Sequence, residues 1–177
     1  MTRRFIAVFL AFAFAASNPT HASDKVLDMY SGKARTRDEV AVIYNPGRFI
    51  QKIDREVLYK SPQIDPNDLV DSMRVLPGSH TIHGMLYAEP IRYSRPPIYK
   101  ETKFKFGIKT EAGHTYYIYF ELVSGQPALG ARDLGENFEP VVKSHPQGRT
   151  PAQITKNDSY YEQLKTSGVD YPIELVH

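Results

Sequence analysis

The fold of this chain is decided by the stretch TKFKFGIKTEAGHTYYIYFEL, residues 102–122. Two apolar sets alternate with polar residues in it, and the segment Glu111-Ala112-Gly113 separates them. The first set is Thr102, Phe104, Phe106 and Ile108, and the second is Tyr116, Ile118, Phe120 and Leu122. Alternation with a period of two is typical of strands that bury one face. We therefore predict two half-buried β-strands.

We expect these two strands to form a hairpin, because a three-residue loop with a left-handed glycine is a common hairpin connection. The register that keeps both apolar sets on one face also pairs Thr110 with His114. A shift by one residue would bury lysines. On the buried face, the expected opposite pairs are Phe106 with Ile118 and Phe104 with Phe120. On the solvent-facing side, which we call the wet face, they are Lys105 with Tyr119 and Lys103 with Glu121.

Shorter elements are predicted on both sides of this stretch. The strand candidates are Val40–Tyr44, one or two strands in Phe49–Leu58, a hairpin of Met73–Leu76 and Thr81–Ala88 around Pro77-Gly78, Ala131–Leu134, Phe138–Val142, and an edge strand in Tyr171–Val176. Ser61–Asp71 has room for one or two helical turns. Ser159 and Glu162 form a capping-box pattern for a short helix that ends before Gly168.

Many short strands with Gly and Pro turns, and no long helical period, predict an all-β protein. We expect an antiparallel β-sandwich over residues 23–142, followed by a C-terminal extension, 143–177, with a short helix. The sequence has no internal repeat of fixed period.

The N-terminus has the order of a cleavable secretory signal. Arg3 and Arg4 precede an apolar run, Phe5–Ala16, that is too short to span a bilayer. Thr20 and Ala22 supply the small residues that signal peptidase requires, which predicts a signal over residues 1–22. We therefore expect a periplasmic or secreted protein with no transmembrane anchor after cleavage.

Composition narrows the classes of protein. The chain has no Cys, so it has neither disulfides nor the lipid-bearing Cys of a bacterial lipoprotein. It holds 22 Lys and Arg against 20 Asp and Glu, and loss of Arg3 and Arg4 with the signal would leave the two balanced. Balanced charge without a dense basic run argues against nucleic-acid binding.

Two short motifs carry a resemblance. Leu76-Pro77-Gly78-Ser79-His80 and Ala112-Gly113-His114-Thr115-Tyr116 are similar to hairpins of small bacterial envelope proteins, and Asp38–Ile43 resembles their first core strand. The resemblance covers about residues 30–142. It implies a transthyretin-like or immunoglobulin-like sandwich in the periplasm or outside the cell, with no established activity.

His80 and His114 each follow a predicted turn on the same face as their strand's apolar set. If both turns lie at one end of the sandwich, the two imidazoles would come close enough for a metal site or a pH-sensitive pair. Two ligands are too few for zinc, and spacing fixes no third ligand. The alternative is that each ring caps its own turn through a backbone hydrogen bond.

Two surfaces are candidates for binding. Lys103, Lys105, Lys109, Tyr117 and Tyr119 share the wet face in the expected register, where lysines beside tyrosines would suit anionic sugars, lipid headgroups or a protein. The alternative is a solvated face with lysines that prevent aggregation. The second surface is the proline-rich segment 90–99, with Arg92, Tyr93, Arg95 and Tyr99, which are residue types enriched at interfaces. The alternative is that this segment is a loop that only connects two strands, which would have the same composition.

No catalytic residue is predicted, because the sequence has no Cys, no nucleophile elbow, no zinc-protease helix and no phosphate-binding loop. An enzyme would need carboxylates brought together in a pocket, and spacing does not set this. The leading hypothesis is a non-enzymatic envelope or secreted module, binding or structural, with no cofactor and with an envelope protein or a glycan as partner. The alternative is a periplasmic protein that binds a small molecule or metal through His80 and His114. The sequence does not indicate the oligomeric state.

Overall fold

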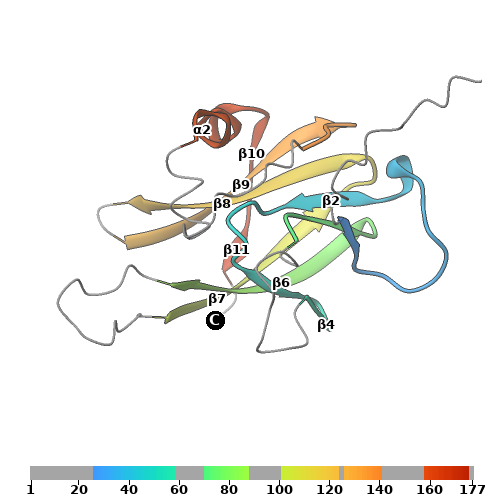
Figure 1. Ribbon diagram of the computed structural model, residues 1–177, viewed down its shortest axis with the longest axis horizontal. Helices are drawn as coiled ribbons and strands as arrows, with labels where there is room; N and C mark the ends of the chain where they lie inside the picture. The colour runs from blue at the N-terminus through green and yellow to red at the C-terminus, as the bar shows by residue number, and fades with distance from the viewer. Residues whose placement is uncertain (1–25, 59–69, 88–100, 124–125, 141–157, 176–177) are drawn as a thin grey trace, which may run out of the picture.

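The computed structural model describes residues 26–58, 70–87, 101–123, 126–140 and 158–175, which form two β-sheets that pack face to face, with a short helix on one side (Figure 1). Sheet A has the order β1 (Val26–Asp28), β5 (Ser72–Val75), β2 (Ala41–Tyr44), β8 (His114–Val123), β9 (Gln126–Glu136) and β10 (Val169–Tyr171). Sheet B has the order β11 (Glu174–Leu175), β7 (Glu101–Thr110), β6 (Gly78–Tyr87), β3 (Ile50–Ile53) and β4 (Glu56–Val57). The described part of the chain is therefore mostly β, as predicted.

The sheets differ in strand direction. Every strand pair of sheet B is antiparallel. Sheet A is mixed, because β1 is parallel to β5 and β2 is parallel to β8. The expectation of a wholly antiparallel sandwich is therefore wrong for sheet A, where alternation of side chains gave no information on the direction of the neighbouring strand.

The hydrophobic core lies between the sheets. Sheet A contributes Ile43 and Ile118, and sheet B contributes Ile82 and Phe106, each of them fully buried. Burial of one such side chain contributes roughly 1.5–3 kcal/mol, so this layer makes a large favourable contribution to the stability of the described fold.

The predicted hairpin of residues 102–122 is wrong, although both of its strands exist. β7 lies in sheet B beside β6, whereas β8 lies in sheet A between β2 and β9. Phe106 pairs with Ile82, and Ile118 pairs with Ala131. Residues 111–113 therefore carry the chain from one sheet to the other, and the two apolar sets face a common core from opposite sides.

The hairpin predicted around Pro77-Gly78 is wrong for the same reason. β5 belongs to sheet A and β6 to sheet B, so Leu76-Pro77 is a second crossing at the same end of the sandwich. The alternation predicted for residues 81–88 is confirmed over its described part, with Ile82 buried and His83 on the other face. Some antiparallel pairs join strands that are consecutive in the chain. Among these pairs are β3 and β4, β6 and β7, and β8 and β9.

The segment after residue 126 differs from its prediction in two places. β9 is one long strand, and no strand continues it over Phe138–Pro140. Tyr171–Val176, predicted as one edge strand, supplies the end of β10 in sheet A and all of β11 in sheet B. The described part of the C-terminal extension thus adds an edge strand to each sheet.

The short C-terminal helix is confirmed as α2 (Ser159–Thr166). Its N-cap is Asp158, whose side chain accepts a hydrogen bond of 2.9 Å from the Tyr160 backbone N–H, so Ser159 is not the cap. α2 lies over the outer face of sheet A (Figure 1), where Tyr161 and Leu164 pack against Tyr44 and Tyr117. A short 3-10 helix, η1 (Arg37–Glu39), precedes β2.

Several predictions fall outside the described residues. These are the signal over residues 1–22, most of the helical turns in 61–71, the proline-rich segment 90–99 and the tail 143–156.

Candidate functional site

The lysines and tyrosines predicted to share one wet face lie on opposite faces of the sandwich. Lys103 and Lys105 belong to the outer face of sheet B, because β7 is a strand of that sheet. Tyr117 and Tyr119 belong to the outer face of sheet A. Tyr117 is only 2% exposed, since α2 covers it. The predicted mixed surface of lysines and tyrosines therefore does not exist.

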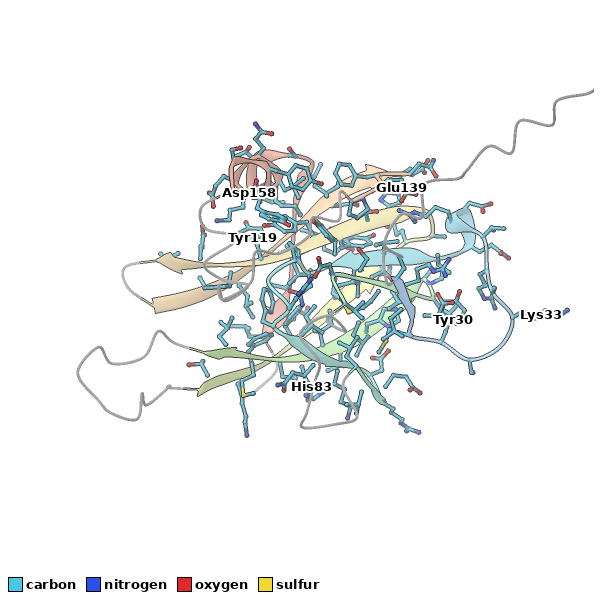
Figure 2. All side chains as sticks on the ribbon, in the orientation of Figure 1. Tyr30, Lys33, His83, Tyr119, Glu139 and Asp158 are labelled. Carbon is cyan, nitrogen blue, oxygen red and sulfur yellow. The ribbon has the colours of Figure 1, made fainter. Side chains whose placement is uncertain are left out.

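The outer face of sheet B carries a row of basic side chains across three neighbouring strands. Lys52 of β3 lies opposite His83 of β6, and His83 lies opposite Lys105 of β7. Successive side chains of a strand point to opposite faces. Because the next residues along β3 and β6, Ile53 and Ile82, are buried in the core, Lys52 and His83 point outward, and Figure 2 shows His83 on the side of sheet B away from sheet A.

Two further lysines lie on the same face. Lys103 is opposite Met85 and Lys109 is opposite Ser79 in the β6–β7 ladder, and both lysines are exposed. We call the set Lys52, His83, Lys103, Lys105 and Lys109 the basic face. The four lysines make no ion pair and no side-chain hydrogen bond with any other residue in the described ranges. Glu174 of β11, opposite Gly107, is an acidic neighbour at the sheet edge, and Glu101 occupies the β7 position two residues before Lys103.

His80 points toward the interior side of sheet B and is held from both sides. Its Nδ1 lies 2.7 Å from Asp54 Oδ2, and its Nε2 lies 2.7 Å from the Leu76 carbonyl oxygen. The Thr81 N–H also donates to Asp54 Oδ1, at 2.7 Å. Each ring nitrogen of His80 lies within hydrogen-bond distance of an oxygen acceptor. His80 thus joins the β3–β4 turn to the crossing at Leu76.

His114 has a different set of partners on sheet A. Its Nδ1 lies 2.9 Å from Asp133 Oδ2, and its Nε2 lies 3.8 Å from Glu136 Oε1. The ring stacks on Tyr116, with centroids 6.3 Å apart. Both contacts with carboxylates come from β9, the hydrogen-bonded neighbour of β8.

The two histidines lie at one end of the sandwich, where both crossings between the sheets occur, but each is bound to carboxylates of its own sheet. Among the residues that the structure describes, no group of three or more His, Cys, Asp or Glu is arranged to hold a metal ion.

The layer between sheet A and α2 is built from tyrosines. Tyr44, Tyr117 and Tyr161 are buried there with Leu164, and Tyr119, Tyr160 and Phe138 pack around them. Burial raises the pKa of Tyr161 to about 12. Burial also raises the pKa of Tyr44 and of Tyr117, with smaller contributions from neighbouring Tyr161 and Glu162. These phenols therefore stay neutral at ordinary pH and act as packing groups.

A buried ion pair lies near this layer. Arg48 Nε donates to Asp71 Oδ1, and both side chains are largely inaccessible. The Asn45 backbone N–H donates a hydrogen bond of 2.7 Å to the Asp71 carbonyl oxygen. Arg48 has a positive φ of 52°, so the pair fixes the turn between β2 and β3 in a conformation that side-chain-bearing residues seldom adopt.

A groove of about 430 Å³ lies between the sheets at the end far from the histidines. It offers one hydroxyl, from Thr102, and no charged group that would orient a polar ligand. Its lining residues are Leu86, Thr102, Phe104, Ala128, Leu129, Ile173 and Leu175.

The four binding candidates Arg92, Tyr93, Arg95 and Tyr99 lie outside the described residues. Of the sequence candidates, the structure keeps Lys103 and Lys105 on the outer face of sheet B and places Tyr119 on the outer face of sheet A. The sequence analysis missed Lys52. A bulge between Ile50 and Lys52 breaks the alternation of β3, and only the β3–β6 register brings Lys52 beside His83.

Comparison with protein-family models, with curated proteins and with solved structures found no match to this chain. Within the described ranges, no helix has the length and apolar character needed to cross a bilayer.

Proposed function

We propose that this protein is an exported, non-enzymatic binding module that takes anionic ligands on the basic face. The observation that carries the proposal is the difference between the two outer faces of the sandwich. α2 covers part of sheet A, whereas no helix among the described residues covers sheet B, whose outer side holds four lysines that form no ion pair with another described residue.

Lys52 and Lys105 lie two strands apart, on either side of His83 and roughly 10 Å from each other, so their mutual repulsion, partly screened by salt, is a small energetic cost in the free protein. A bound anion would offset that cost. Lysines also protect sheet edges from aggregation, and in the described residues β11 pairs with only Phe106 and Gly107 of β7. Lys52 is different, because it lies on β3 between β4 and β6, where no edge is left to protect. The arrangement therefore favours binding over simple solubility.

Export is part of the proposal and rests on the signal pattern of residues 1–22. The fold group is also proposed, as transthyretin-like or immunoglobulin-like, on the two-layer arrangement and the resemblance of the two His-containing motifs. The geometry of His80 and His114 supports a structural role for both rings, which agrees with a module that does no chemistry.

The proposal is tested with a polyanion that has no shape specificity. Binding of the purified protein to dextran sulfate is measured by isothermal titration calorimetry at low and at moderate salt. We expect binding that weakens with salt, and a several-fold loss in the Lys103→Gln/Lys105→Gln double variant. Lys33→Gln, an exposed lysine in the loop before η1 (Figure 2), is the matched control and should bind like the parent. Equal affinity of the double variant and the parent would contradict the proposal.

A further inference from the structure

We infer that the anionic ligand of the basic face is the surface of a membrane rich in acidic phospholipid, and that protonation of His83 strengthens this contact. The inference rests on the proposed function, because it requires that the basic face bind anions.

The positions of the basic residues form a two-dimensional array. Neighbouring strands lie about 4.8 Å apart, so the backbone positions of Lys52 and Lys105, two strands apart, are separated by roughly 10 Å. Along β7, Lys103 and Lys109 are six residues apart, which is roughly 20 Å. The array thus extends in both directions of the sheet.

The spread of the basic side chains suits a ligand that presents charge at many points. A small anion is bound by donors that converge in a concavity. The basic side chains instead stand side by side on the outside of a sheet, and the groove of the described structure lies between the sheets, lined by other residues. A planar layer of acidic headgroups presents negative charge at many points at once, which suits an array of this kind.

The residues between the lysines are compatible with a headgroup layer. Met85 lies opposite Lys103, Ser79 opposite Lys109 and Thr81 opposite Gly107. The lysine stems are themselves apolar and can lie along the layer while the ammonium groups reach phosphate oxygens.

His83 lies at the centre of the row. The groups that face it are Lys52 from β3 and Lys105 from β7, with Lys103 diagonal to it, Thr81 and Met85 on its own strand, and Glu174 of β11 beyond Gly107. Histidine is the side chain that changes charge between about pH 5 and 8. The protonated ring completes a row of three positive charges, and an acidic surface favours that form. By linkage, binding must then tighten as the pH falls.

The test uses co-sedimentation of the purified protein with vesicles of phosphatidylcholine, either alone or mixed with phosphatidylglycerol, at about pH 5.5 and about pH 7.5. We expect binding to the mixed vesicles only, tighter at the lower pH. Each basic residue should change the partition coefficient roughly fivefold. Lys105→Gln should weaken binding at both pH values, and Lys33→Gln should leave it unchanged. His83→Gln should bind equally at both pH values.

The outcomes separate this inference from the proposed function. A protein that binds dextran sulfate but not the acidic vesicles would overturn the membrane inference and leave the anion-binding module in place. A pH dependence that persists in His83→Gln would overturn the role of His83. If the parent protein bound neither dextran sulfate nor the acidic vesicles, the proposed function would be contradicted as well.

Discussion

Tyr44 and Tyr117 lie opposite each other in the parallel β2–β8 pair, with their ring centroids 5.9 Å apart. Both rings are on the outer face of sheet A, yet both are buried, because Tyr161 and Leu164 of α2 pack on them. This tyrosine layer makes the two sides of the sandwich unlike. One side carries a second, smaller core under the helix, and the other presents the basic face.

The packing of α2 predicts the effect of Leu164→Ala. Leu164 is 3% exposed, and truncation would leave a cavity above Tyr117. We expect the free energy of unfolding to fall by about 2–3 kcal/mol. Urea denaturation followed by tyrosine fluorescence measures this, since the chain has 12 Tyr and no Trp. Gln163→Ala, on the exposed side of the same helix, should change stability by less than about 0.5 kcal/mol, and an equal loss in both variants would contradict the packing of α2.

The raised pKa values of the tyrosine layer predict a loss of stability in alkali. The pKa of Tyr161 is about 12 in the folded protein against its ordinary value of 10.0. Above about pH 10 the unfolded chain therefore holds fewer protons than the folded one, so stability falls as the pH rises from about 10 toward 12. Tyrosinate absorbance should show a group of phenols that ionise only when the protein unfolds. A native titration that matches the titration in denaturant would be incompatible with the buried layer.

The two contacts of the His80 ring predict that replacement of His80 costs more stability than replacement of His83. His80→Ala removes both hydrogen bonds and leaves Asp54 and the Leu76 carbonyl without this donor, so we expect a loss of about 1.5–3 kcal/mol in the free energy of unfolding. His83→Ala, on the solvent side of the same strand, is the matched control and should stay within about 0.5 kcal/mol of the parent. Thermal denaturation of the two variants compares them directly, and similar midpoints would rule out the structural role assigned to His80.

Replacement by alanine should have very different effects on stability at two glycines of sheet B. A Cβ on Gly84 would overlap the Phe104 ring and approach the Phe49 carbonyl oxygen to 2.5 Å. A Cβ on Gly107 would meet nothing closer than Glu174, at 4.0 Å. Gly84→Ala should therefore destabilise the fold by about 3 kcal/mol, whereas Gly107→Ala should be nearly neutral. Chemical denaturation of both variants tests the β3–β6–β7 packing that places the basic face, and a tolerated Gly84→Ala would argue against it.

The sequence was sufficient to predict the strands at 102–109 and 115–122 and the side chains that they turn toward the core, such as Phe106 and Ile118. It did not predict that Thr115 and Tyr117, on the other face of β8, are buried as well. It was not sufficient to predict the partners of these strands. Phe106 and Ile118 would show the same alternation whether their strands were hydrogen-bonded or faced each other across a core. The loop 111–113 serves either connection, since Gly113 has a positive φ of 82° in the crossing as it would have in a hairpin.

The basic face and the covered face of sheet A could be predicted only in part, because alternation along a strand does not show which segments lie beside it. The outward direction of His83 and Lys105 follows from alternation alone. The position of Lys52 beside His83 depends on a pairing between segments about 30 residues apart and on a bulge in β3. The covering of Tyr117 depends on α2, which lies more than 40 residues further along the chain, and no local pattern near Tyr117 marks a face that a distant helix will bury.

The central claim is that anions bind to the outer face of sheet B. NMR chemical-shift mapping of the backbone amides during titration with a sulfated dextran oligosaccharide tests it most directly. The account predicts that the largest shifts occur around Lys52, His83 and Lys105, with small shifts around Tyr161 and Leu164. Shifts concentrated on α2 and the outer face of sheet A, with sheet B unchanged, would contradict it.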